Sequence, residues 1–148
     1  MIKGADFSNN SFAQDEILIP TPIFYKTDLS AKEGNVSNST YMDSRFYFPV
    51  TFINGKKYKL YIHVTGTKID TGQTELLFVR AVPNATTPTG VNLAEITTSQ
   101  VDNVADYIIK SEVTMNTTES YLYILIKWSK KYSTEYPIIK KVYIQELD

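Results

Sequence analysis

Six side chains on predicted strands have the chemistry of a binding surface. Sugars present apolar C–H faces that stack on exposed aromatic rings, and a few polar groups then fix their orientation. Three tyrosines and three polar companions alternate with apolar positions, which predicts that they face solvent: Tyr47, Tyr61, Tyr123, Arg45, His63 and Lys127. The pattern predicts a surface that binds a glycan or a protein partner, with Tyr61 and Tyr123 as a platform if their strands are neighbours.

Other uses of the same tyrosines stay open. Tyrosine is a favoured strand residue, and cross-strand pairs stabilise a sheet by roughly 0.2–1 kcal/mol. A subunit interface is enriched in the same aromatic residues. The six residues therefore mark a candidate surface without naming its ligand.

Catalytic chemistry has few candidates in this chain. His63 is the single histidine and cysteine is absent, so neither a nucleophile with the usual base nor a cluster of zinc ligands is expected. The six glycines are scattered singly, which excludes a glycine-rich phosphate loop. Sixteen acidic residues leave paired carboxylates for glycoside hydrolysis open. We expect no enzyme, no metal and no cofactor.

The charge and the apolar stretches exclude two classes of partner. Fifteen basic residues stand against sixteen acidic ones in 148 residues, which argues against nucleic-acid binding through phosphate neutralisation. The longest apolar stretches, such as "YLYILI" at 121–126, are far shorter than the roughly 20 residues that span a bilayer. The opening "MIKGADFSNN" lacks the apolar core of an export signal. If Met1 is the natural start, we expect the chain to stay in the cytoplasm where it is made.

Alternation of side chains predicts the central strands. In 57–65, four apolar residues share one face, Tyr58, Leu60, Ile62 and Val64, and the polar residues with Tyr61 and His63 share the other. The run before it alternates in the same way, and Asn54-Gly55 between the two runs is a strong hairpin signal. We therefore predict that residues 45–65 form one antiparallel hairpin.

The rest of the chain predicts further strands and no helix that covers a core. Strands are expected at 74–82, at 107–115 and 120–128 as a second hairpin, and in the C-terminal "YPIIKKVYIQEL", with Ile138, Val142 and Ile144 on one face and Trp128 in the core. A polar loop at 84–90 and a long connection follow the first of these, with a short helical turn near 99–106. Residues 1–44 are expected to be less regular: short strands in "IKGADFS" and "EILIP", and a loop at 30–40. The prediction is an all-β fold, a two-sheet antiparallel β-sandwich of the jelly-roll type, as a single domain over 1–148.

Several segments together carry a resemblance to a known group of modules. "KGADFSNN", "SRFYFPV" leading into "NGKKYKLYIHVTG", and the terminal "IIKKVYIQELD" resemble jelly-roll, carbohydrate-binding-like modules of Bacteroides surface proteins and of tail and fibre proteins of phages that infect that group, including crAss-like phages. The order of these segments matches over most of the chain. The resemblance implies a binding or structural role without catalysis, and it transfers no ligand residue.

Three functions follow as expectations. The first is a phage virion structural or adhesion protein that decorates a capsid, fibre or tail and assembles in the host cytoplasm, because no export signal is found. Its partners are other virion proteins or further copies of itself, and contact with surface glycan stays open. The alternative is a bacterial carbohydrate-binding module, and the third is a small glycan hydrolase.

Overall fold

The computed structural model describes residues 21–38, 42–67, 75–97, 105–128 and 136–147. Over these residues the chain is almost entirely β-structure. The strands are β1 (Phe24–Ser30), β2 (Asn35–Asn38), β3 (Met42–Phe52), β4 (Lys57–Thr67), β5 (Glu75–Val82), β6 (Val91–Thr97), β7 (Ala105–Thr114), β8 (Glu119–Trp128) and β9 (Ile138–Leu147), with a 3-10 turn η1 (Ala31–Glu33) after β1. Among the described residues, no helix has the length and apolar character needed to cross a membrane.

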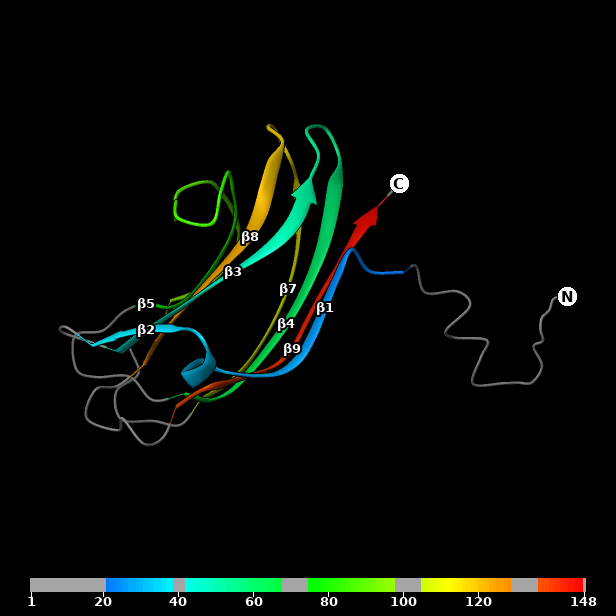
Figure 1. The fold of residues 1–148 in the computed structure, drawn as a ribbon. Coiled ribbons are helices and arrows are strands. Elements are labelled where there is room, and N and C mark those ends of the chain that lie inside the picture. The colour runs from blue at the N-terminus through cyan, green and yellow to red at the C-terminus, as the bar shows by residue number, and fades with distance from the viewer. Residues whose placement is uncertain (1–20, 39–41, 68–74, 98–104, 129–135, 148) are drawn as a thin grey trace, which may run out of the picture.

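The strands form two antiparallel sheets that pack face to face. Sheet A has the order β1-β9-β4-β7, and sheet B has the order β2-β3-β8-β5-β6. Figure 1 shows them as two layers, with β1, β4, β7 and β9 in one and β3, β5 and β8 in the other. Leaving aside the short edge strand β2, this order is that of a jelly roll, with the first and last strands paired. The predicted fold class is confirmed.

Alternation places the core between the sheets as predicted. Tyr58, Leu60, Ile62 and Val64 of β4 are all buried, and they meet buried residues of β3, β5 and β8 from the other sheet. Trp128 is also buried, and its indole N–H donates to Ser44 Oγ at 3.0 Å. This bond satisfies the polar atom of a side chain that otherwise packs as a hydrophobe.

The predicted hairpin over 45–65 is wrong. β3 pairs with β2 and β8, whereas β4 pairs with β7 and β9, so the Asn54-Gly55 turn carries the chain from sheet B to sheet A. Lys56 N–H donates to Ile53 O at 3.0 Å, and Gly55 has a φ of 86° while Asn54 is not in the left-handed region. This combination is that of a type II turn, whereas a type I′ hairpin turn needs positive φ at both central residues. The turn therefore makes a corner between sheets.

The second predicted hairpin, 107–115 with 120–128, is wrong for the same reason. β7 belongs to sheet A and β8 to sheet B, so Met115–Thr118 forms a second corner. The two corners hold each other: Gly55 N–H donates to Met115 O at 2.8 Å, and Met115 N–H donates to Lys56 O at 2.9 Å. The Asn54 N–H is capped by Thr118 Oγ1 at 2.9 Å. Main-chain N–H and C=O groups of each turn therefore form hydrogen bonds with the other turn.

Two regions predicted to be irregular contain regular structure. The segment 30–40, predicted as a loop, holds η1, which Ser30 and Glu33 cap reciprocally, and then β2. β1 also lies within the less regular segment 1–44, and β6 lies in the predicted long connection. The expected strands in "IKGADFS" and "EILIP" lie outside the described residues, as does most of the expected turn at 99–106, whose last two residues begin β7.

A bulge in β9 changes which residues face inward. His63 is opposite Lys141 while the next residue, Val64, is opposite Ile139, which leaves Lys140 as an extra residue. Ile139 and Val142 are consequently both fully buried, so the prediction that Ile138 shares the inner face with Val142 is wrong. Lys141, which alternates with the buried Val142 and lies before any shift of register from Tyr143, is on the outer face of sheet A opposite His63.

Candidate functional site

The six predicted site residues fall on two opposite surfaces. Tyr47, Tyr123, Arg45 and Lys127 lie in β3 and β8 of sheet B, and Tyr61 and His63 lie in β4 of sheet A. Because the sheets pack through their other faces, these two outer faces point in opposite directions. Tyr61 and Tyr123 therefore form no common platform.

On sheet B the predicted residues pack with one another. Tyr47 and Tyr123 are register partners, with ring centroids 4.9 Å apart at 41°. Tyr123 is 1% exposed and belongs to a small apolar cluster with Val82 and Leu125. The prediction that Tyr123 faces solvent is wrong, because alternation indicates the face of the sheet and not what packs on it.

Burial and a nearby guanidinium act on these two hydroxyl groups. Burial raises the pKa of Tyr123 above its usual value of 10.0, and the hydrogen bond and charge of Arg45 oppose that rise. Burial also raises the pKa of Tyr47, with a further contribution from Tyr123. Arg45 donates to Ser37 Oγ at 3.2 Å and lies 3.5 Å from an Asp43 carboxylate oxygen. The Arg45 side chain is thus engaged within sheet B.

On sheet A three tyrosines form a row across adjacent strands. Tyr25 of β1 is opposite Tyr143 of β9, and Tyr143 is opposite Tyr61 of β4. Lys110 of β7 continues the row beside Tyr61. Tyr25 is 52% exposed, and its ring meets that of Tyr143 edge to face at 6.2 Å. The register thus gives a continuous aromatic strip on the outer face of the sheet.

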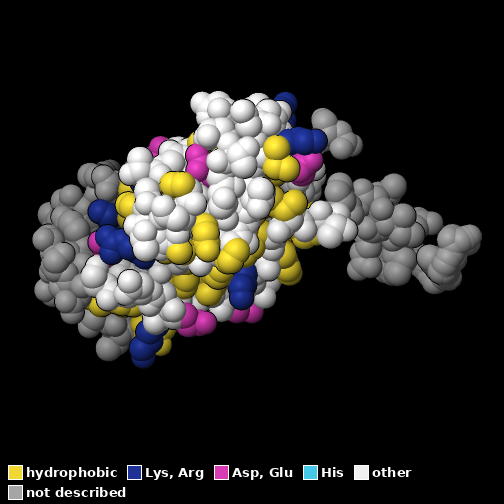
Figure 2. Space-filling view, turned by 45° about the horizontal axis from the view of Figure 1, so that its top comes forward, with side chains coloured by type: hydrophobic (Ala, Val, Ile, Leu, Met, Phe, Trp, Pro, Cys, Tyr) yellow, Lys and Arg dark blue, Asp and Glu magenta, His cyan; other side chains and the backbone are white. Residues whose placement is uncertain are grey.

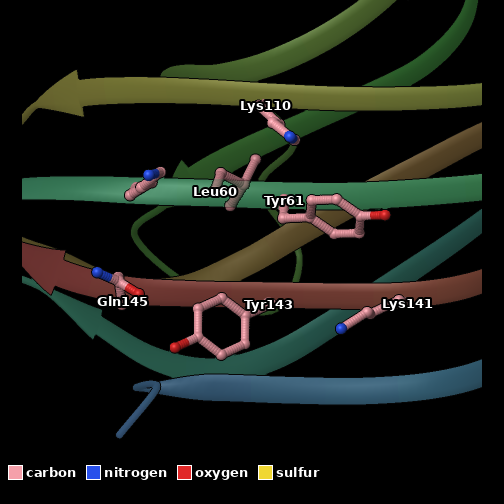
Figure 3. Close-up of a pocket in the computed structure, with 7 residues that line it drawn as sticks. Leu60, Tyr61, Lys110, Lys141, Tyr143 and Gln145 are labelled. Atoms are coloured by element: carbon pink, nitrogen blue, oxygen red, sulfur yellow. The ribbon is translucent and has the colours of Figure 1, made fainter. Parts of the chain in front are cut away.

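The strip borders a shallow groove of about 350 Å³. Its lining comes from β4, β7 and β9: Lys59, Leu60, Tyr61, Lys110, Lys141, Tyr143 and Gln145. Figure 3 shows Tyr61 and Tyr143 on neighbouring strands, with Gln145 and Lys141 toward opposite ends of β9 and Lys110 on the far side of Tyr61. The ring of Tyr143 is seen face-on in this view.

Lys141 is positioned by two rings of the same strip. Its ammonium lies 5.4 Å from the Tyr61 ring centroid and 5.9 Å from that of Tyr25, both within cation–π range. His63, the register partner of Lys141, is half-buried on the same face. The geometry therefore joins two predicted residues, Tyr61 and His63, to residues that were not predicted.

Sequence reasoning missed Tyr143 and Tyr25 for different reasons. Tyr143 lies between two buried residues of a strand that was predicted, so alternation alone could have placed it outward. Tyr25 lies in the segment that was predicted to be less regular. Neither residue could be assigned beside Tyr61 without the strand order.

The groove offers contacts for binding and no acid–base pair. Its lining includes no carboxylate, whereas glycoside hydrolysis needs two. No group of three or more His, Cys, Asp or Glu side chains that could hold a metal occurs within the described ranges. Figure 2 shows hydrophobic side chains, tyrosine included, in a band on the face turned to the viewer, interrupted by polar atoms.

The protein resembles solved structures in its fold and has no match in sequence among protein families or curated proteins. Among solved structures it is similar to apo CBM1, a carbohydrate-binding module of BiXyn10A, with a TM-score of 0.45 and 12% identity over 76% of this chain and 68% of that one. It is also similar to the C-terminal CBM6 of LamC, a marine laminarinase of Zobellia galactanivorans, with a TM-score of 0.36 and 12% identity over 84% of this chain and 93% of that one. Likeness at this level carries no argument about the site, and the resemblance to Bacteroides and phage proteins is not shown by these comparisons.

Proposed function

We propose that the protein is a non-catalytic glycan-binding module that holds a sugar chain on the outer face of sheet A. The observation that carries the proposal is the row Tyr25, Tyr143 and Tyr61 beside an open groove. Aromatic faces bury the C–H faces of sugar rings, and Gln145 and the lysines at the rim supply hydrogen-bond donors. This corresponds to the bacterial carbohydrate-binding module that the sequence left as the alternative.

The other expected functions have less support. No observation on the described residues favours assembly into a virion over glycan binding. The three tyrosines predicted to form one contact surface, Tyr47, Tyr61 and Tyr123, lie on two different sheets. A hydrolase would need two facing carboxylates, and the groove has none along its lining. The binding surface is therefore Tyr25, Tyr61 and Tyr143 in place of Tyr47 and Tyr123.

A glycan array followed by calorimetry with the best ligand tests the proposal. Tyr61→Ala and Tyr143→Ala should each weaken binding roughly tenfold or more, which corresponds to about 1.4 kcal/mol. Tyr61→Phe should retain most of the affinity, because it keeps the ring. The matched control is Ile108→Ala, because Ile108 is 56% exposed on the same face but outside the groove.

Two outcomes would contradict the proposal. One is the absence of binding across the array by a folded protein that light scattering shows to be monomeric. The other is glycan binding that Tyr47→Ala removes and the two groove substitutions leave unchanged, which would assign the site to sheet B.

A further inference from the structure

The groove on sheet A contains several positively charged side chains, which stacking of a neutral sugar on the tyrosines does not require. Three of its lining residues are lysines, one from each of three adjacent strands: Lys110 of β7, Lys59 of β4 and Lys141 of β9. The chain as a whole has a formal net charge of −1. The positive charge of the groove lining therefore differs from the nearly neutral charge of the whole chain.

These lysines form no ion pair within the described part of the chain. The ion pairs found around them use other lysines: Lys56 with Glu146 at 3.4 Å and Lys140 with Asp28 at 3.2 Å. Glu112 is the register partner of Lys59, yet the two side chains do not pair. Glu112 lines an adjoining hollow with Lys59 and Lys110, but no carboxylate of the described residues forms an ion pair with any of the three ammonium groups. An anion in the groove can therefore pair with them.

The lysines lie around the tyrosine strip. Lys59 is two residues before Tyr61, and Lys141 is opposite His63, two residues after it. At about 3.3 Å per residue, these two positions are separated by about 13 Å along the strand direction. A sugar chain stacked on Tyr143 and Tyr61 would run across the strands, with Lys110 beyond Tyr61 at one end and with Lys59 and Lys141 on its two sides.

We infer that the preferred ligand is a polysaccharide containing uronic acids, an inference that rests on the proposed function. A uronate carboxylate is attached directly to the edge of the pyranose ring, so the ring face can remain stacked on tyrosine while the carboxylate reaches a lysine. Hydrogen bonds between ammonium and carboxylate are stronger than those between neutral groups. Lys141, held between the Tyr25 and Tyr61 rings, loses less side-chain freedom on binding than a free lysine.

A matched pair of ligands separates charge from sugar recognition. Polygalacturonic acid and its fully methyl-esterified form share one backbone and differ in the charge of the carboxyl group. Calorimetry should show the acid form binding at least roughly tenfold more tightly, with the difference shrinking as salt is raised. Dextran sulfate and dextran form a second pair, for which we expect no comparable gain.

Substitutions assign the charge preference to the groove. Lys141→Gln should reduce the preference for the acid form roughly tenfold, and Lys59→Gln and Lys110→Gln should each reduce it to a smaller extent. The control is Lys57→Gln, because Lys57 is exposed on the same strand but does not line the groove. It should leave the preference unchanged.

The failures of the two proposals are distinguishable. Equal binding of the acid and esterified forms, with Tyr61→Ala still disruptive, would overturn the uronate inference and leave the glycan-binding module intact. Preference for dextran sulfate, or equal binding of duplex DNA, would overturn it in favour of sulfated sugars or general polyanion binding. No binding to any polysaccharide would reject the proposed function as well.

Discussion

At the scale of single residues, two outward-facing tyrosines have different roles. Tyr61 borders an open groove, whereas Tyr123 is 1% exposed and packs with Val82 and Leu125. Alternation places both on outer faces, because the side chains of a strand point to opposite sides with a period of two. Whether a residue on that face contacts solvent depends on its neighbours from other strands.

The raised pKa of Tyr123 predicts a loss of stability in alkali. Burial raises this pKa, so the group contributes stability below the unfolded pKa of about 10, and that contribution is lost as pH rises through the folded pKa. Urea unfolding measured between about pH 8 and pH 11 should show a smaller fall for Tyr123→Phe than for the wild type. Tyr25→Phe, which removes a hydroxyl from a half-exposed ring, is the control. An unchanged pH dependence in Tyr123→Phe would show that other groups cause the loss.

At the scale of elements, the Asn54-Gly55 turn connects strands of two different sheets, whereas its sequence is typical of a hairpin within one sheet. Asn54-Gly55 is compatible with a type I′ turn, but the hydrogen bonds of the second corner at Met115 and Thr118 hold it in the type II form. The positions of β3 and β4 were predicted correctly while their pairing was not. Local turn chemistry therefore located the chain reversal without deciding which sheet it enters.

Alanine substitutions of Gly55 and Gly90 test, respectively, the turn at the first corner and the close approach of Gly90 to the main chain of Ala81. Gly55→Ala should cost about 1 kcal/mol of unfolding free energy, because the added Cβ meets no atom within 4 Å and only the positive φ is unfavourable. Gly90→Ala should cost more, because its Cβ would overlap the Ala81 carbonyl oxygen. Asn54→Ala is the control, since the Asn54 contact to Thr118 uses the main-chain N–H. Urea denaturation measures all three, and a Gly55→Ala variant as stable as the wild type would argue against the type II turn.

At the scale of the whole molecule, the jelly-roll order makes most pairings nonlocal. Along β3 to β9, only β5 and β6 are neighbours both in the sequence and in a sheet. β9 pairs with β1 and β4, which lie far from it in the chain. Core residues from both sheets meet in one cluster, so the sheets depend on each other for burial.

We predict a single cooperative unfolding transition and slow refolding, in milliseconds to seconds, because loop closure must precede nonlocal pairing. The fluorescence of Trp128, the single tryptophan, reports on the buried core, and far-UV circular dichroism reports on the strands. The two probes should give coincident urea transitions, and stopped-flow fluorescence should give the rate. Two separate transitions would contradict the expectation of one domain over 1–148.

The sequence by itself determined the class of fold and the faces of its central strands. Tyr58, Leu60, Ile62 and Val64 are buried, and Trp128 is in the core, because a period of two is a local property of the chain. Only the tertiary structure decided that Tyr25, Tyr143 and Tyr61 meet, that Tyr47 and Tyr123 pack elsewhere, and that Lys141 faces the groove. Those outcomes depend on strand order and register, which are set by hydrogen bonds between strands distant in the chain.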